Sequence, residues 1–292
     1  MIEALVAIDL GATNLRVAAI KENLDIIKVS RERTVKDDKE ALYAQIKRMV
    51  SEVTEDIKFK FIGISACGFT SYNNLDVLPN LHIKNLDLST RLERDFPGCK
   101  VRLANDANCT CLIEALKGAA KDDDTTYFIT ISSGIGAGLV VDKKLVDRPF
   151  ELGHNYLSYK GETYELEYLC SGNGIVNLCR INGVTVENAY EFFTRVKDKD
   201  EAILPIYQDW INLLSIQIAN IYLLYNPDSI VLSGGCMKSI DIFYDDLYKR
   251  SSELISRYPL KKLVLKNAQF DQDAGLMGAT SQALALLNES RE

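Results

Sequence analysis

The chain has 292 residues, with 47% hydrophobic side chains, 26% charged side chains and a formal net charge of −7. This length favours two lobes over a single core, and an acidic balance without a concentrated basic face argues against a nucleic-acid partner. No uncharged stretch reaches the roughly 18 residues that a membrane span needs, so no membrane partner is expected. A strand pattern begins almost at Met1, which leaves no room for a secretion signal and predicts a cytoplasmic protein.

The first part of the sequence predicts a mixed α/β sheet. Its expected elements, in chain order, are a strand hairpin at 6–20, a strand at 24–33, a helix at 36–57, a strand at 59–69, a polar loop through Asn80, a helix from Ser89 to Phe96, a strand at 100–109 and a helix to residue 120. Apolar residues at helical spacing and runs of β-forming residues carry these assignments. An antiparallel start followed by alternating strands and helices is typical of a mixed sheet.

The second part repeats this layout. Residues 127–146 read as strand, small-residue turn and strand, as residues 5–24 do, and they are followed by a helix at 201–225, a strand at 228–235, a helix at 240–255, a strand at 261–267 and a helix at 273–287. This repetition predicts two similar halves. We expect a small N-terminal lobe at 1–110, a large lobe at 111–279, and a C-terminal helix at about 280–292 that packs back on the small lobe.

A small-residue turn follows the first strand of each half. In the first half Asp9 precedes Gly11, Ala12, Thr13 and Asn14, and the turn of the second half holds Ser133, Gly134 and Gly136. Backbone N–H groups in such turns bind phosphate, and the upstream aspartate would hold Mg²⁺ directly or through water. Neither turn has the sequence of a Walker A loop or of a dinucleotide fingerprint. One such turn alone is compatible with an ordinary hairpin, but two of them favour a pair of turns that grip a polyphosphate.

A second candidate site is the run Ala-Asn-Asp-Ala-Asn at 104–108, at a junction between strand and helix. Open α/β sheets bind ligands beyond the carboxyl ends of their strands, so the Asp106 carboxylate is expected at the mouth of a cleft. There it could take the proton of an attacking hydroxyl that Asn105 orients. The alternative is that Asn105 or Asp106 only caps a helix that begins near Asn108.

A polar stretch at 150–172 provides the third candidate set: Glu151, His154, Glu162, Glu165 and Glu167. These side chains suit hydrogen bonds to a polyol. They do not suit a zinc site, because the cysteines that would complete one are missing. A lone histidine is more often a structural hydrogen-bonding residue than a catalyst. For His154 we still favour a contact with a ligand.

Six segments, in order along the chain, resemble the motifs of the ROK family, the group named for repressors, open reading frames and kinases. They are DLGATNLR at 9–16, NDAN at 105–108, SSGIGAG at 132–138, ELGH at 151–154, SGG at 233–235 and DAGLMGA at 273–279. Each segment alone is a weak signal, and the six together run through nearly the whole chain. In DLGATNLR, the family positions Asp9, Gly11, Thr13 and Arg16 are all present.

The resemblance implies a two-lobed, actin-like and hexokinase-like fold of the ribonuclease H-like type, with a duplicated mixed sheet. It implies ATP and Mg²⁺ as cofactors, a small-molecule sugar as the substrate and a homodimer. Asp106 would be the catalytic base, and Gly234 and Gly235 would form the adenosine turn. The sugar contacts that it implies are Asn80, Asn105, Asp106, Glu151, His154 and Glu167.

The chain departs from the family pattern in two places. The family's zinc-ligand cysteines fall at Ser158, Lys160 and Glu165, which predicts that this chain holds no structural zinc. The family tryptophan after Asn80 is replaced by Lys84, which predicts a sugar pocket that is more open or more polar and could accept a substituted sugar.

These features predict phosphoryl transfer from MgATP to a hexose-type hydroxyl, at C6, with glucose, a β-glucoside, N-acetylmannosamine and fructose all open as acceptors. One rival is a sugar sensor without catalytic activity, but family repressors carry an added N-terminal DNA-binding segment and this chain is acidic. The other rival is an actin-like acyl or acetate kinase or an ATPase, which the ELGH and NDAN segments disfavour.

Overall fold

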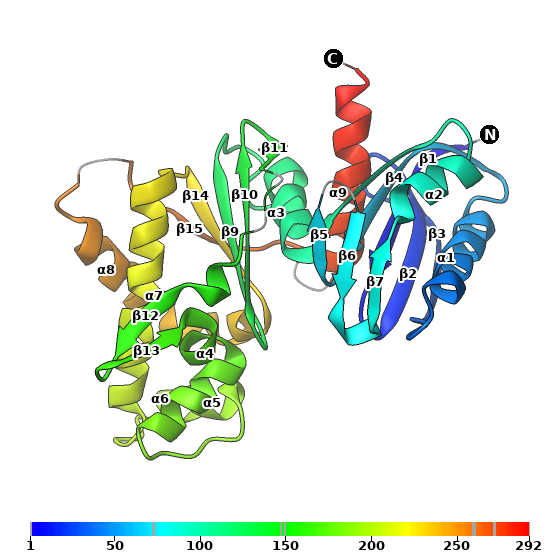
Figure 1. Cartoon of the computed structure of the whole chain (residues 1–292). Coiled ribbons are helices and arrows are strands. Elements are labelled where there is room, and N and C mark those ends of the chain that lie inside the picture. The colour runs from blue at the N-terminus through cyan, green and yellow to red at the C-terminus, as the bar shows by residue number, and fades with distance from the viewer. Residues whose placement is uncertain are drawn as a thin grey trace. The chain divides into compact units, whose positions relative to one another are not determined.

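A computed structural model describes residues 2–71, 74–146, 148, 150–258, 261–270 and 273–291 of the chain (Figure 1). The chain divides into two compact units. Unit 1 comprises Met1–Gly118, Lys143–Pro149 and Gln272–Glu292, and unit 2 comprises Ala119–Asp142 and Phe150–Asp271. The lobe boundaries at residues 110 and 279 stay a prediction from the sequence. None of the helices in the described ranges combines the length and the apolar character that crossing a membrane requires.

Unit 1 begins with a strand hairpin and ends with the C-terminal helix of the chain. Its elements are β1 (Ile2–Leu10), β2 (Asn14–Ile20), β3 (Ile26–Arg33), α1 (Lys39–Val53), β4 (Ile57–Ala66), β5 (Phe69–Ser71), β6 (Asn74–Leu78), the 3₁₀ helix η1 (Pro79–Leu81), β7 (Ile83–Leu86), α2 (Leu88–Asp95), β8 (Lys100–Asn105), α3 (Asp106–Lys117), β11 (Lys144–Leu145) and α9 (Ala274–Glu289).

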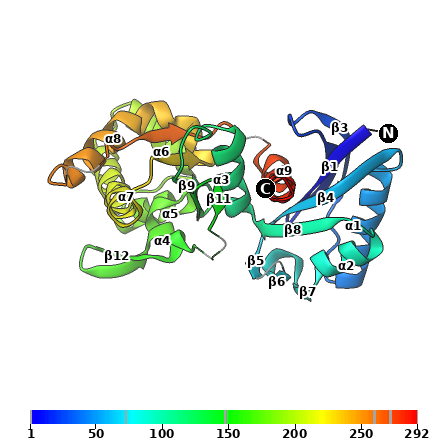
Figure 2. The same ribbon diagram turned by 90° about the horizontal axis from the view of Figure 1, so that it is seen from above.

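The main sheet of unit 1 has the order β3-β2-β1-β4-β8, with both β2 pairings antiparallel and the pairs β1–β4 and β4–β8 parallel. Alternate residues of a strand point to opposite faces. Val6, Ile8 and Leu10 of β1 therefore share one face, and they join the core that includes Leu42 and Ile46 of α1. The opposite face carries α9, which packs on β1 and β4, as the view from above shows (Figure 2).

The prediction of a polar loop through Asn80 is wrong in part. Strands β5, β6 and β7 form a separate three-stranded sheet there. Its apolar residues Leu75, Leu78 and Ile83 are buried in the same core as α1. The sequence shows mainly polar Ser, Asn and Asp residues in this region, and strands this short carry too few apolar positions for a clear alternation.

Two boundaries around α2 and α3 also differ from the prediction. The N-cap of α2 is Asp87, whose carboxylate accepts a hydrogen bond from Thr90 N, and not Ser89. Strand β8 ends at Asn105 and α3 begins at Asp106, two residues before the predicted start. Both aspartate and asparagine are strong N-caps, and the residue that takes the role depends on where the preceding strand ends.

Unit 2 contains the second sheet and most of the helices. Its elements are β9 (Thr126–Ile131), β10 (Ile135–Val141), η2 (Leu152–His154), β12 (Tyr156–Tyr159), β13 (Glu162–Glu165), α4 (Leu166–Cys170), α5 (Gly172–Ile181), α6 (Ala189–Lys197), α7 (Leu204–Tyr225), β14 (Ser229–Ser233), η3 (Gly235–Ser239), α8 (Ile240–Ile255) and β15 (Leu265–Asn267).

The sheet of unit 2 repeats the order of the first. Strands β10, β9, β14 and β15 are neighbours in that order, with β9–β10 antiparallel and β9–β14 and β14–β15 parallel. They correspond to β2, β1, β4 and β8 of unit 1. The predicted duplication of a mixed sheet is therefore confirmed. The strand predicted at 261–267 is shorter in the structure, where β15 includes only Leu265–Asn267.

An aromatic core holds the helices of unit 2 together. Phe193, Trp210 and Phe243, from α6, α7 and α8, have ring centroids 5.1–5.3 Å apart. The indole Nε1 of Trp210 donates a hydrogen bond of 3.1 Å to the carbonyl of Cys170, which anchors the end of α4 to α7. Helices α7 and α8 lie side by side (Figure 1). This core supports the segments that carry the ELGH and SGG motifs.

Candidate active site

The first predicted phosphate turn connects β1 to β2. Asp9 and Arg16 lie directly opposite each other on these antiparallel strands. Arg16 Nε donates to Asp9 Oδ2 at 2.8 Å, and Arg16 Nη2 lies 2.7 Å from the same oxygen. The cross-strand register thus places one carboxylate and one guanidinium at the base of the turn. The same oxygen of Asp9 accepts both bonds.

The turn itself is held from two sides. Gly11 N donates to the Asn14 carbonyl at 3.1 Å, which closes the turn. Thr34, just beyond β3, donates its hydroxyl to the Gly11 carbonyl at 2.7 Å and its backbone N–H to the Thr13 carbonyl at 3.1 Å. Thr13 is exposed at the tip of the turn. The carbonyls of the turn are therefore directed toward Thr34.

The first turn of α9 packs against the Asp9 carboxylate. A Cβ atom added to Gly275 would lie 2.5 Å from Asp9 Oδ1 and 2.6 Å from its Cγ. Asp273, just before the helix, lies 3.7 Å from Arg16 through its own carboxylate. The DAGLMGA segment thus lies beside the first phosphate turn, and its glycine leaves room for Asp9.

The Asn-Asp pair at 105–106 occupies the junction of β8 and α3. Asn105 is the N-cap: its Oδ1 accepts from Ala107 N at 2.9 Å, and its Nδ2 donates to the Gly68 carbonyl at 3.2 Å. Asn105 therefore caps α3, and its contact with a substrate stays a prediction from the sequence. Asp106 is exposed, and its Oδ1 accepts from Ala107 N at 2.8 Å. Its carboxylate is accessible to a substrate.

Asp9 and Asp106 both have a pKa raised above the ordinary value of an aspartate. Desolvation by the surrounding protein raises the pKa of Asp106, and the negative charge of Asp9 adds to the effect. Desolvation also raises the pKa of Asp9, although the charge and the hydrogen bond of Arg16 act in the opposite direction. A raised pKa makes a carboxylate a stronger base, which suits the acceptance of a proton from a hydroxyl.

The second predicted phosphate turn connects β9 to β10 in unit 2. Ser132 N donates to the Gly134 carbonyl at 2.8 Å, so Ser132, Ser133 and Gly134 form a tight turn with Ser133 exposed. The Ser132 carbonyl accepts from Gly172 N at 2.6 Å. Gly136 lies in β10 opposite Thr130, beyond the turn.

The ELGH segment forms the short helix η2. Glu151 is exposed, and its carbonyl accepts a hydrogen bond from His154 N at 3.0 Å. His154 Nδ1 lies 3.1 Å from Glu165 Oε2 of β13. The hydrogen bond to the Glu165 carboxylate, with the negative charges of Glu165, Glu151 and Glu167, raises the pKa of His154 above its ordinary value. This arrangement collects several carboxylates around one imidazole.

The predicted adenosine turn, Gly234 and Gly235, and the predicted sugar contact Asn80 lie at two short 3₁₀ helices, η3 and η1. Gly234 follows β14 with φ of +98°, a conformation that L-residues rarely adopt, and Gly235 begins η3 with open space around it. A Cβ atom at Gly234 would lie 2.4 Å from the Ile131 carbonyl oxygen, so this strand end needs a glycine, and only at Gly235 does the backbone face open space. Asn80 is exposed in η1, between β6 and β7 of unit 1.

The residues at the zinc-ligand positions do not fit a zinc ion. Ser158 lies in β12, Lys160 is in the connection to β13 with φ of +50°, and Glu165 ends β13 beside His154. A hydroxyl and an ammonium cannot replace thiolate ligands of zinc. Across the described ranges, no three His, Cys, Asp or Glu side chains are grouped so as to hold a metal ion.

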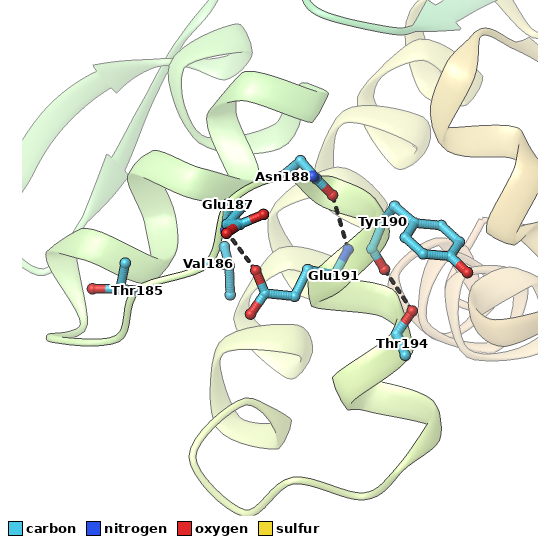
Figure 3. Close-up of a pocket in the computed structure, with 7 residues that line it drawn as sticks. All are labelled: Thr185, Val186, Glu187, Asn188, Tyr190, Glu191 and Thr194. Atoms are coloured by element: carbon cyan, nitrogen blue, oxygen red, sulfur yellow. Dashed lines mark hydrogen bonds between the residues drawn. The ribbon is translucent and has the colours of Figure 1, made fainter.

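A separate cavity of about 460 Å³ lies at the start of α6 (Figure 3). Its lining residues are Thr185, Val186, Glu187, Asn188, Tyr190, Glu191 and Thr194. The polar groups there bond to one another: Asn188 Oδ1 accepts from Glu191 N at 3.0 Å, and Glu191 Oε2 accepts from Glu187 N at 2.7 Å. None of the motif residues lines this cavity.

Sequence reasoning missed three supporting residues. Thr34 gave no signal, because its contact with the turn depends on how β3 ends. Glu165 was seen only as one member of a polar cluster, and the cross-strand geometry of β12 and β13 brings it to His154. Gly275 belongs to a recognised motif, but its function of leaving space for Asp9 depends on where α9 packs.

The whole chain resembles known proteins. A family model described as ROK family matches residues 5–286. N-acetyl-D-glucosamine kinase of Histophilus somni is 29% identical over 306 residues, covering 95% of this chain and 98% of that protein. The glucokinase of Thermotoga maritima is 25% identical over 307 residues, covering 95% and 96%. The crystal structure of a ROK hexokinase from Thermus thermophilus has a TM-score of 0.86 at 22% identity, covering 98% of this chain and 99% of that chain.

The structural match confirms the predicted actin-like, hexokinase-like fold, and the family match confirms the resemblance read from the motifs. The two curated relatives are both named as sugar kinases. The chain therefore belongs to the ROK family and groups with the carbohydrate kinases of that family.

Proposed function

We propose that this protein transfers the γ-phosphoryl group of MgATP to the C6 hydroxyl of a hexose or an N-acetylhexosamine, with Asp106 as the base. The observation that carries the proposal is the register of the unit 1 sheet. Leu10 of β1 pairs with Ala66 of β4, which pairs with Asn105 of β8. The first phosphate turn and Asp106 therefore come directly after strands that end at the same edge of the sheet. The ends of these two strands, β1 and β8, lie two inter-strand spacings apart, which is about 10 Å.

Asp9 suits a magnesium ion that ATP brings with it. Mg²⁺ keeps several waters and is typically held by one or two carboxylates together with substrate phosphates. Arg16 bonds to Oδ2 of Asp9, and both carboxylate oxygens lie against the Gly275 position. When bound, the ion would neutralise charge on the phosphates. We assign Asp9 to this ion, either directly or through water.

We assign the phosphates of ATP to the two turns, Gly11–Asn14 in unit 1 and 132–134 in unit 2. Each turn follows the first strand of a duplicated sheet and exposes its tip residue, Thr13 or Ser133. Gly234 and Gly235 are assigned to the adenosine. Gly136 lies within β10, two residues beyond Gly134, and is assigned to the same phosphates.

The acceptor is assigned by chemistry and by the names of the relatives. The amide, carboxylate and imidazole groups that we assign to the sugar are those of Asn80, Asn105, Asp106, Glu151, His154 and Glu167. Both N-acetylglucosamine and glucose are substrates named for relatives of similar length. Lys84 is exposed on β7, which is compatible with a pocket that accepts an N-acetyl group.

In the proposed reaction the main task of the protein is to position the two substrates. In phosphoryl transfer the protein orients the two reactants and stabilises charge, and a positioned base contributes about 10²–10⁴-fold. Asp106 would accept the hydroxyl proton as the oxygen attacks the γ-phosphorus. Its raised pKa supports this role, because a carboxylate of ordinary pKa is a weaker base.

The test is ATP consumption with glucose, N-acetylglucosamine, N-acetylmannosamine, fructose and a β-glucoside disaccharide. Turnover that depends on one of these sugars, with the product phosphorylated at C6 by NMR, supports the proposal. Sugar binding without turnover would identify a sensor instead, and hydrolysis that does not depend on sugar would identify an ATPase.

We also infer a homodimer. The side chains of Ile216, Leu223 and Leu224 on α7 are 37%, 41% and 76% exposed. Leu223 and Leu224 follow Ile216 by seven and eight residues, about two helical turns, which places the three on one helix face. Light scattering after size exclusion measures the mass. The cytoplasmic location stays a prediction from the sequence.

A further inference from the structure

Two motif segments of unit 2, SSGIGAG and ELGH, meet helix α4 at the carboxylate of Glu167. This residue lies in the first turn of α4 and is half-buried. Its Oε2 accepts a hydrogen bond of 2.7 Å from the backbone N–H of Ile135, the first residue after the second phosphate turn. The side chain assigned to the sugar therefore contacts the turn assigned to ATP.

Two glycines leave space for this carboxylate. A Cβ atom on Gly134 would lie 2.3 Å from Glu167 Oε2. A Cβ atom on Gly153, from the ELGH segment, would lie 3.2 Å from the same oxygen and 2.6 Å from the Ile135 carbonyl. Real Cβ contacts this short would displace the carboxylate or the strand. The turn, the ELGH segment and α4 thus fit together only around the Glu167 side chain.

The backbone around Glu167 is also fixed. Its carbonyl accepts the hydroxyl of Ser171 at 2.7 Å, and the following Gly172 N donates to the Ser132 carbonyl at 2.6 Å. Glu167 and Gly172 therefore hold the two ends of the turn from the same α4–α5 segment. A shift of this segment would move both ends of the turn.

We propose that Glu167 is a positioning residue for the second phosphate turn, in addition to any contact that it makes with the sugar. This inference rests on the proposed function. The turn would be positioned through the length of the Glu167 side chain, which lets Oε2 reach Ile135 N, and not through its charge alone. Nucleotide affinity should then depend on Glu167 even when no sugar is present.

Two conservative substitutions separate reach from charge. Glu167→Gln keeps the length and a carbonyl oxygen that can accept from Ile135 N, but it removes the charge. Glu167→Asp keeps the charge but is one methylene shorter. The matched control is Glu201→Asp, because Glu201 is exposed in unit 2 and belongs to none of the candidate sites. All three variants are mild enough to fold, which thermal melting checks.

The measurements are the affinity for Mg²⁺ with a non-hydrolysable ATP analogue, without sugar, and hydrogen exchange at the Ile135 amide. Because a hydrogen bond to a charged acceptor is worth an order of magnitude or more, Glu167→Asp should weaken nucleotide binding by about tenfold. It should also speed Ile135 exchange. Because Glu167→Gln keeps this bond in its weaker neutral form, it should lose less than Glu167→Asp does on both measures, about threefold. Glu201→Asp should change neither measure.

An unchanged nucleotide affinity in Glu167→Asp, with only the sugar KM raised, would reduce Glu167 to a sugar contact and overturn the inference. A loss in Glu167→Gln with none in Glu167→Asp would assign the effect to charge and overturn it as well. The exchange of the Ile135 amide is read without substrate. It therefore tests the positioning role even if the sugar panel shows no kinase activity.

Discussion

At the scale of single residues, Asp106 carries opposing influences on its proton affinity. It stands in the first turn of α3, where the positive end of the helix dipole favours the carboxylate form. It also accepts a hydrogen bond from Ala107 N, which lowers the pKa, while desolvation and the charge of Asp9 raise it. Desolvation is the largest influence on the pKa, so the group is a stronger base than an ordinary aspartate. The Asp106 side chain is nevertheless exposed, which leaves it accessible to a substrate.

Replacing this base should separate catalysis from binding. Asp106→Asn keeps the size of the side chain and removes the proton acceptor, so turnover should fall by about 10²–10⁴-fold while sugar binding persists. Steady-state kinetics and calorimetry measure the two effects. Asp122→Asn, an exposed aspartate of unit 2, is the control. Turnover retained in Asp106→Asn would remove Asp106 from the proposed mechanism.

The ion pair of His154 with Glu165 should make the sugar site sensitive to pH. The pKa of His154 is raised above its ordinary value of about 6.5, so the imidazolium and its pairing persist to higher pH than usual. The stabilisation is complete below the unfolded pKa and is lost as pH rises through the folded pKa. The sugar KM should therefore increase across that range.

NMR titration can check this residue directly, because the chain has only two histidines, His82 and His154. The His154 midpoint should lie above that of a free imidazole and move down in Glu165→Gln. His82→Gln assigns the two signals. The side chains of the pair are 52% and 41% exposed, so its contribution to stability should stay near the 0.2–1 kcal/mol typical of exposed pairs. An unmoved midpoint in Glu165→Gln would contradict the pairing.

At the scale of elements, the β12–β13 hairpin occupies the segment where the family pattern has its zinc loop. Its strands pair from Tyr156 with Glu165 to Tyr159 with Glu162. The two connecting residues, Lys160 and Gly161, both have positive φ, as a type I′ turn requires. The rings of Tyr164 and Tyr168 stack at 5.6 Å. Hydrogen-bonded strands and stacked rings thus order this segment.

A hairpin that is ordered in this way should not depend on zinc. A zinc chelator such as phenanthroline, added with excess Mg²⁺, should leave both the melting temperature and the kinase activity unchanged. Elemental analysis of the purified protein should find no stoichiometric zinc. A fall in melting temperature that added zinc reverses would show that the hairpin binds the metal after all.

Helix α9 affects the phosphate turn through one missing side chain. Gly275→Ala would place a methyl group 2.5 Å from Asp9 Oδ1, so the carboxylate must move away from its place at the turn. We expect the KM for MgATP to rise by about tenfold, as for the loss of a hydrogen bond to a charged group. Steady-state kinetics with varied MgATP measure it.

A double-mutant cycle with Asp9→Ala tests the cause. If the effect of Gly275→Ala acts through the carboxylate, it should largely disappear once Asp9 has been shortened, because residues in contact do not act additively. Full additivity of the two substitutions would instead assign the loss to a general distortion of α9.

At the scale of the whole molecule, unit 1 is assembled from both ends of the chain. The chain leaves this unit after α3 and returns to it briefly at Lys143–Pro149. It returns for α9 only after the sheet and helices of unit 2 are complete. Gly63 of β4 shows how close the helix packs, because a Cβ there would lie 2.0 Å from the Ala279 carbonyl. Most of α9, from Leu276 to Leu284, is buried.

Removing α9 should therefore prevent unit 1 from folding. A chain that stops after Phe270 would expose the sheet face that α9 covers, and we expect it to aggregate or to lose its cooperative melting transition. The control is Arg291→Ala, which removes only the exposed ion pair with Glu22 and should cost at most about 1 kcal/mol. A well-folded truncated chain would contradict the role given to α9.

The sequence alone determined the parts of this protein that depend on neighbouring residues. Alternation and helical spacing marked most strands and helices, and the repeat at 127–146 indicated the second sheet. The polar composition of 70–80 concealed β5 and β6, because such short strands leave too few positions for a pattern. The motif spacing marked Asp9, Asp106 and both turns before any contact was known.

Only the tertiary structure decided which atoms those residues meet. Asn105 rather than Asp106 became the helix cap, since β8 ends at Asn105 and α3 begins at Asp106. Glu165 reached His154 through strand pairing, and Glu167 reached Ile135 N across 32 positions of the chain. A local pattern reports on a residue and its near neighbours, whereas these bonds depend on how distant segments pack, and no spacing along the chain records that.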